Sequence, residues 1–70
     1  MTQQERILRH IADYGSISSR EAMEEYGIMR LASRVNDLRH AGHPIVREME
    51  SSKNRYGESV TYARYRLERR

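Results

Sequence analysis

The sequence predicts an α+β fold in which three helices are followed by a two-stranded β-hairpin. Two patterns carry this prediction. Helix-capping signals and apolar residues at helical spacing run from residue 2 to residue 41, and alternating β-branched and aromatic residues mark the C-terminal third. The length of 70 residues predicts a single domain over residues 1–70, with a thin core.

The first helix is predicted to begin after Thr2, which can cap it while Glu5 completes a capping box. Gly15 is expected to end this helix, with Tyr14 packing at its end. One stripe at helical spacing predicts the buried side of the helix: Ile7, Leu8, Ile11 and Ala12.

A short extended link separates the first two helices. Ile17 is its only apolar residue, so we expect it to be buried, in a possible short third strand. Ser18 and Glu21 form a second capping box, which starts a helix near Ser19 that ends at Gly27. The side chains expected on its buried side are Ala22, Met23 and Tyr26.

The third helix is predicted over about Met29–Ala41, with Gly42 as its stop. Apolar residues at i, i+3, i+4 and i+7 predict its core side: Ile28, Leu31, Ala32, Val35 and Leu38. The opposite arc carries polar side chains: Arg30, Ser33, Arg34, Asn36, Asp37 and His40.

Two helices joined at a glycine are typical of a helix-turn-helix, whose second helix enters the DNA major groove. Arginine can pair with guanine and asparagine with adenine, so the polar arc suits base reading. The other interpretation is a solvated face on which Asp37 simply pairs with Arg34. We expect DNA contacts from Arg30, Ser33, Arg34, Asn36 and Asp37.

The remainder of the chain predicts a hairpin, because Pro44 blocks further helix. Strands are expected at Ile45–Glu50 and Val60–Leu67, with Ala63, Tyr65 and Leu67 on one face and Val60, Tyr62, Arg64 and Arg66 on the other. A basic hairpin tip after a helix-turn-helix is typical of a winged helix, although any hairpin tip is polar. The wing residues expected on the DNA backbone or in the minor groove are Lys53, Asn54, Arg55 and Tyr56, within a loop over 51–59.

The net charge of +3 is unevenly distributed along the chain. Residues 1–28 hold three basic and five acidic residues, whereas residues 29–70 hold ten basic and five acidic ones. The basic excess therefore begins with the third helix, and arginine outnumbers lysine twelve to one. This asymmetry indicates a surface that faces a polyanion.

The run GIMRLASRVNDLRHAGHPI followed by NRYGESVTYARYRL resembles the small winged helix-turn-helix domains of bacteriophages and prophages. The resemblance covers nearly the whole chain, and its most specific part is Gly27 to Ile45. It implies DNA binding in transcription regulation or as an excision-type recombination accessory factor. The motif positions carried over are Arg30, Arg34, Asp37 and Arg39 on the helix and Asn54, Arg55 and Gly57 in the wing.

Met29 departs from that family pattern, which more often has a polar capping residue there. Loss of the cap leaves free N–H groups at the start of the third helix, which a DNA phosphate could satisfy. An apolar contact of Met29 with a thymine methyl or with a partner protein remains open.

Enzymatic, cofactor and metal functions are not expected. The chain shows no Ser-His-Asp arrangement and no glycine-rich phosphate loop, and it contains no cysteine. His40 and His43 are three residues apart, but Gly42 separates them and no third ligand is evident, so no metal site is predicted. No apolar run is long enough to span a membrane and the N-terminus is polar, which predicts a cytoplasmic protein. The resemblance to phage and prophage domains implies that this cytoplasm is that of a bacterial host cell.

The expected partner is double-stranded DNA, bound by a homodimer or by a cooperative array of copies, because one small module binds modestly. The main alternative is a helix-turn-helix-shaped module that binds a host protein through Met29, Tyr56 and Tyr62. RNA binding is a weaker alternative, because the sequence lacks an aromatic platform on a sheet.

Overall fold

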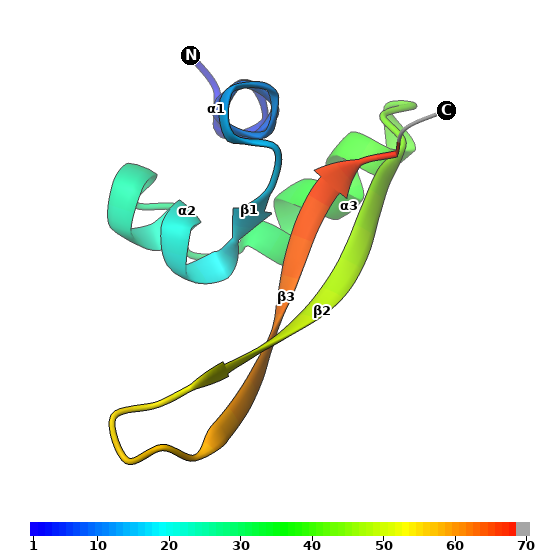
Figure 1. Ribbon diagram of the computed structural model, residues 1–70. Helices are drawn as coiled ribbons and strands as arrows, with labels where there is room; N and C mark the ends of the chain where they lie inside the picture. The colour runs from blue at the N-terminus through cyan, green and yellow to red at the C-terminus, as the bar shows by residue number, and fades with distance from the viewer. Residues whose placement is uncertain (69–70) are drawn as a thin grey trace.

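The computed structural model describes residues 1–68 and confirms the α+β class and the short third strand (Figure 1). Its elements are α1 (Gln3–Tyr14), β1 (Ile17–Ser18), α2 (Ser19–Tyr26), α3 (Leu31–His40), β2 (Ile45–Lys53) and β3 (Ser59–Leu67). The strands form one antiparallel sheet in the order β1-β3-β2. Three helices therefore pack beside a sheet whose long hairpin projects beyond them (Figure 1).

Both predicted capping boxes are present. The backbone N–H of Glu5 donates to the Thr2 hydroxyl at 3.2 Å, and the N–H of Glu21 donates to the Ser18 hydroxyl at 3.3 Å. The two glutamates reciprocate, accepting from the backbone N–H of Thr2 at 3.0 Å and of Ser18 at 2.9 Å. These local bonds set where α1 and α2 begin.

The third helix starts later than predicted, at Leu31 rather than Met29. Gly27 adopts a left-handed conformation with φ 67°, and the N–H of Ile28 donates to the carbonyl of Ala22 at 3.0 Å. Ile28 thus closes the end of α2 and turns its side chain into the core, where it is 2% exposed. The chain can begin a new helix only after this turn, which places Met29 outside α3.

The core gathers apolar side chains from every helix and strand: Ile7, Ile11, Ile17, Ala22, Ile28, Leu31, Val35, Leu38, Ile45 and Tyr65. The predictions that Ala12, Met23 and Ala32 are buried are wrong, because all three are exposed. Each directly follows a buried residue and so lies about 100° around the helix from it, outside the narrow contact stripe of a small core.

The hairpin is longer than predicted and its loop is shorter. The ladder continues to the pair Lys53↔Ser59, so the loop spans residues 54–58 instead of 51–59. Ser51 and Ser52 pair with Thr61 and Val60, because serine can occupy a strand when cross-strand backbone pairing is available.

We expect Leu31→Ala to lower the free energy of unfolding by about 2–5 kcal/mol, because Leu31 is 1% exposed and its truncation leaves a cavity. Met29→Ala, two residues earlier and 76% exposed, is the matched control and should change it by less than about 0.5 kcal/mol. Urea unfolding followed by circular dichroism measures both. Equal losses in the two variants would contradict the placement of this turn.

Candidate nucleic-acid interface

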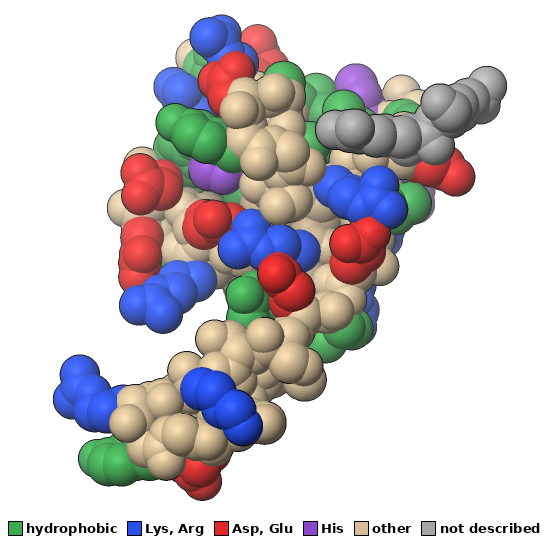
Figure 2. Space-filling model, in the orientation of Figure 1, with side chains coloured by type: hydrophobic (Ala, Val, Ile, Leu, Met, Phe, Trp, Pro, Cys, Tyr) green, Lys and Arg blue, Asp and Glu red, His purple; other side chains and the backbone are tan. Residues whose placement is uncertain are grey.

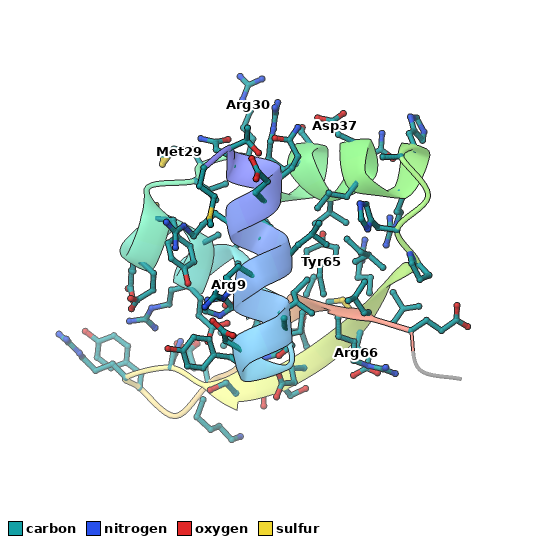
Figure 3. All side chains as sticks on the ribbon, turned by 90° about the horizontal axis from the view of Figure 1, so that it is seen from above. Arg9, Met29, Arg30, Asp37, Tyr65 and Arg66 are labelled. Carbon is teal, nitrogen blue, oxygen red and sulfur yellow. The ribbon has the colours of Figure 1, made fainter. Side chains whose placement is uncertain are left out.

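The outward side of α3 carries most of the helix residues predicted to read DNA. Arg30, Ser33, Asn36 and Asp37 are exposed, whereas Leu31, Val35 and Leu38 turn into the core. In Figure 3, Met29, Arg30 and Asp37 lie along one edge of the molecule, and Arg66 lies toward the opposite edge. The first part of the predicted site is therefore assembled on one surface.

Arg34 differs from the other predicted helix residues because it lies on the flank of α3. Its side chain is 35% exposed, and its Nη1 lies 3.6 Å from Oδ2 of Asp37. Its Nε is buried and has no hydrogen-bond partner within residues 1–68. The Arg34–Asp37 pair, which the sequence left open, is thus formed. Arg30, just before α3, has no carboxylate partner among the described residues.

The start of α3 has free backbone donors. Arg30 occupies the N-cap position with φ −118° and ψ 61°, and its side chain makes no capping hydrogen bond. The first N–H groups of the helix therefore point outward without a side-chain partner. Together with the helix dipole, they make this end of α3 attractive to an anion.

The hairpin tip is held by one asparagine. Oδ1 of Asn54 accepts the backbone N–H groups of Tyr56 at 2.9 Å and Glu58 at 3.0 Å, and its amide donates to the Glu58 carboxylate. This organisation leaves Arg55 and Tyr56 at the surface, with Tyr56 84% exposed. Asn54 thus shapes the tip and presents its neighbours.

The wing residues Lys53 and Asn54 lie beside α2 rather than α3. They line a groove of about 550 Å³ together with Ser19 and Arg20 of α2 and Tyr62 of β3. Figure 2 shows this hollow between the helical body and the hairpin. The predicted residues therefore form two surfaces, one on α3 and one at the tip, and the groove at the tip includes no residue of α3.

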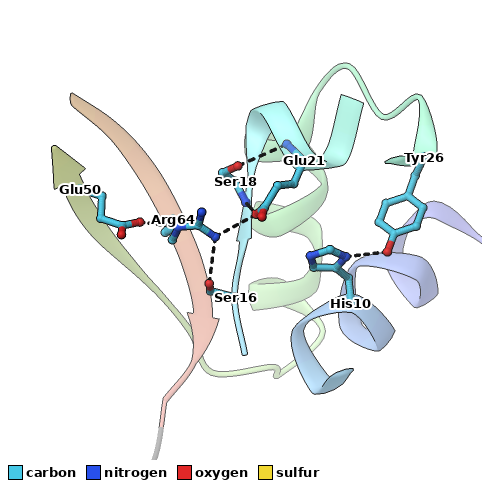
Figure 4. A network of polar contacts seen from close by, with 7 residues as sticks. All are labelled: His10, Ser16, Ser18, Glu21, Tyr26, Glu50 and Arg64. Carbon is cyan, nitrogen blue, oxygen red and sulfur yellow. Dashed lines mark hydrogen bonds and ion pairs between the residues drawn. The ribbon is translucent and has the colours of Figure 1, made fainter. Parts of the chain in front are cut away.

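Arg64 connects the hairpin to the first helix of the helix-turn-helix (Figure 4). Its Nη1 donates to Oε1 of Glu21 at 2.9 Å and to the hydroxyl of Ser16 at 3.1 Å, and its Nε donates to Glu50 on β2. Oε1 of Glu21 also accepts the backbone N–H of Ser18, so one carboxylate both caps α2 and holds the sheet. The sequence analysis missed this contact, because Arg64 and Glu21 are 43 positions apart and no local pattern joins them.

The environment of Glu21 favours its charged form. Burial acts to raise the pKa of Glu21, but the Ser18 backbone hydrogen bond and the Arg64 charge outweigh it and lower the pKa below its ordinary value. The folded protein therefore binds a proton at Glu21 less readily than the unfolded chain does.

A second polar contact joins α1 to α2. Nδ1 of His10 lies 2.5 Å from the hydroxyl of Tyr26, and His10 is 6% exposed. Arg6 lies over the Tyr26 ring at 5.3 Å from its centroid, and Tyr14 lies 4.7 Å from His10 between ring centroids, although Tyr14 is 74% exposed. This contact orients α2 on α1 and involves no residue of the predicted DNA surface.

Residues 1–68 offer neither a metal-binding cluster nor a membrane-spanning helix. No group of three or more His, Cys, Asp or Glu side chains is placed to hold a metal ion in this part of the chain. None of its helices has the length and apolar character needed to cross a bilayer.

A helix-turn-helix of α2 and α3, followed by the β2–β3 hairpin, defines the class of winged helix-turn-helix proteins. Residues 2–70 match the family model described as the winged helix-turn-helix domain, and the chain belongs to that family. Comparison with curated proteins and with solved structures gives no match. Helix-turn-helix families are DNA-binding and not typically enzymes, so membership suggests a DNA partner.

Glu21→Gln tests the link between the α2 cap and Arg64. Since its pKa is lower in the folded state, Glu21 contributes stability above its unfolded pKa, and this contribution is lost as the pH falls through the folded pKa. We expect Glu21→Gln to lower the free energy of unfolding by about 1 kcal/mol at neutral pH, with solvent screening limiting the effect. The free energy of unfolding of the variant should then fall less than that of the wild type as the pH is lowered. Urea midpoints measured across the acid range report this.

The control is Glu24→Gln, which removes a carboxylate from the exposed Arg20 pair on the same helix. Its acid profile should follow the wild type. An unchanged profile for Glu21→Gln would refute the link.

Proposed function

We propose that this chain binds double-stranded DNA in a sequence-specific manner, with α3 in the major groove and the hairpin tip on the backbone or in the minor groove. The observation that carries the proposal is the exposed, uncapped start of α3, where Arg30, Ser33 and Asn36 face outward. Recognition helices contact base edges with residues near their N-terminus, and Arg and Asn suit guanine and adenine.

The roles divide between the two surfaces. Arg30, Ser33 and Asn36 contact bases or nearby phosphates, and Asp37 orients Arg34 on the flank of the same helix. At the tip, Lys53, Arg55 and Tyr56 contact the sugar-phosphate backbone, while Asn54 keeps the loop in shape. Phosphate contacts fix the register on DNA, and base contacts supply specificity.

A single module of this kind buries about 600–1,000 Å² of protein surface on DNA, which gives modest affinity. We therefore propose that two or more copies act together, as a homodimer on a palindromic site or as an array on repeated sites. The motif resemblance supports a phage or prophage transcription regulator or an excision-type recombination accessory factor. Either role places the protein in the cytoplasm of a bacterial host cell.

The second candidate function is binding of a host protein. Two large apolar side chains on the predicted DNA surfaces favour it, since Met29 is 76% and Tyr56 84% exposed. They lie in the turn before α3 and at the hairpin tip, and the groove lined by Tyr62 includes neither of them. DNA binding remains the preferred function because cations flank both side chains.

Binding to mixed-sequence duplex DNA should weaken steeply with salt. With about five phosphate contacts, log K should fall with a slope near −4.5 against log salt concentration. The double variant Arg30→Ala with Arg55→Ala should lose affinity and reduce the magnitude of the slope by about 2. Fluorescence anisotropy of a labelled duplex measures both quantities.

The control for this experiment is Arg9→Ala, because Arg9 is paired with Asp13 on α1, away from both surfaces. Its slope should equal that of the wild type. DNA binding that does not respond to salt, or that survives the double substitution unchanged, would favour the protein-binding candidate.

Arg30→Ser separates folding from function. Serine at this N-cap position can accept a backbone N–H that Arg30 leaves free, so the free energy of unfolding should rise by about 0.5–1 kcal/mol. The same change removes a cation and fills the anion-binding end of α3, so affinity for DNA should fall. A thermal melt and an anisotropy titration on one preparation measure the opposite shifts, and a gain in both would contradict the assigned role of Arg30.

A further inference from the structure

The two faces of the β2–β3 hairpin differ in composition. Alternate residues of a strand point to opposite faces, so the face that starts at the buried Ile45 is turned toward the core and, at its start, toward α3. On this helix-side face, Ile45 is followed along β2 by Arg47, Met49, Ser51 and Lys53. Their cross-strand partners on β3 are Leu67, Tyr65, Ala63, Thr61 and Ser59.

The opposite face of the hairpin, which contacts α2 through Arg64, has its charges neutralised. Arg66 donates to Glu48, and Arg64 donates to Glu50 and Glu21, so each arginine has at least one carboxylate partner. Figure 2 views the molecule from this side, where the blue side chains over the part of the sheet beside the helices are bordered by red ones. Neither Arg64 nor Arg66 therefore has an uncompensated charge to offer a polyanion.

The helix-side face holds two cations and no acid. Arg47 makes no ion pair within residues 1–68, and its Nη2 lies 3.6 Å from the sulfur of Met49. Lys53 donates to the hydroxyl of Ser59 at 3.1 Å, which leaves its charge uncompensated. Arg47 and its neighbour Met49 are both exposed, so the charge of Arg47 is accessible to a ligand.

The same face adjoins α3. Nε of Arg39, in the last turn of α3, donates to the carbonyl of Ile45 at 2.9 Å and so ties the start of β2 to the end of the recognition helix. Arg47 follows Ile45 by two residues on the same face. A duplex against the outward side of α3 can therefore reach the helix-side face of the hairpin without crossing the sheet.

We propose that the phosphate backbone of duplex DNA runs along the helix-side face of the hairpin next to α3, and that Arg47 is a phosphate contact of this site. Lys53 lies six residues of strand farther along β2, about 20 Å away beside α2, and belongs to the tip contacts of the proposed function. This inference deepens the proposed function and rests on it. It adds a residue that the sequence analysis did not select, and it determines which face of the hairpin meets DNA.

The experiment compares two substitutions that remove the same charge from opposite faces of the hairpin. Arg47→Ala should weaken binding to a mixed-sequence duplex about 3- to 10-fold and reduce the magnitude of the salt slope by about 1. Arg66→Ala should leave the slope unchanged, because its charge is already paired with Glu48. Arg47→Lys should restore the slope, and thermal melts show that each variant is folded.

The outcomes separate the inference from the proposed function. If the wild type binds DNA with salt dependence but Arg47→Ala behaves like it, the inference fails and the proposed function stands. Equal losses of DNA affinity for Arg47→Ala and Arg66→Ala would mean that only the net charge matters, which also overturns the inference. A wild type with no salt-dependent binding overturns both.

Discussion

The helix-turn-helix depends on the burial of Ile28 in the turn between its two helices. An eight-residue helix such as α2 is not stable alone and needs tertiary contacts. Ile28 provides one by closing α2 through its backbone N–H while its side chain enters the core beside Leu31 and Val35. The same turn delays α3 and leaves Met29 and Arg30 outside it, so the uncapped start of α3 is a consequence of packing.

Which cations of this molecule are available to a ligand depends on their ion pairs more than on the net charge. Many of its arginines are held by carboxylates, and Arg64 shows why this matters: it offsets Glu21 and Glu50 while joining α2 to the hairpin. Surface ion pairs of this kind add little stability individually, but this one also orients two parts of the fold. Cations that make no ion pair within residues 1–68, such as Arg30 on the α3 side and Arg47 on the hairpin, then mark surfaces on which a polyanion gains the most.

Much of the fold follows from local signals. The capping boxes at Thr2 and Ser18 and the glycine at position 27 set the helix boundaries correctly, because their hydrogen bonds join residues close in sequence. The start of α3 and the length of the hairpin were predicted less well. Both depend on partners that are distant in sequence, such as the core around Ile28 and the strand opposite Ser51.

For the candidate site, the sequence could identify candidate residues but could not show which of their charges are neutralised by an ion pair. The exposure of Ser33 and Asn36 follows from helical spacing, whereas the pairing of Arg64 with Glu21 joins residues 43 positions apart. The sequence by itself determined the order of the elements and the two capping boxes, because these are short-range properties of the chain. Only the tertiary structure decided that Arg64 and Arg66 are neutralised while Arg47 is not, because strand register selects which side chains face one another.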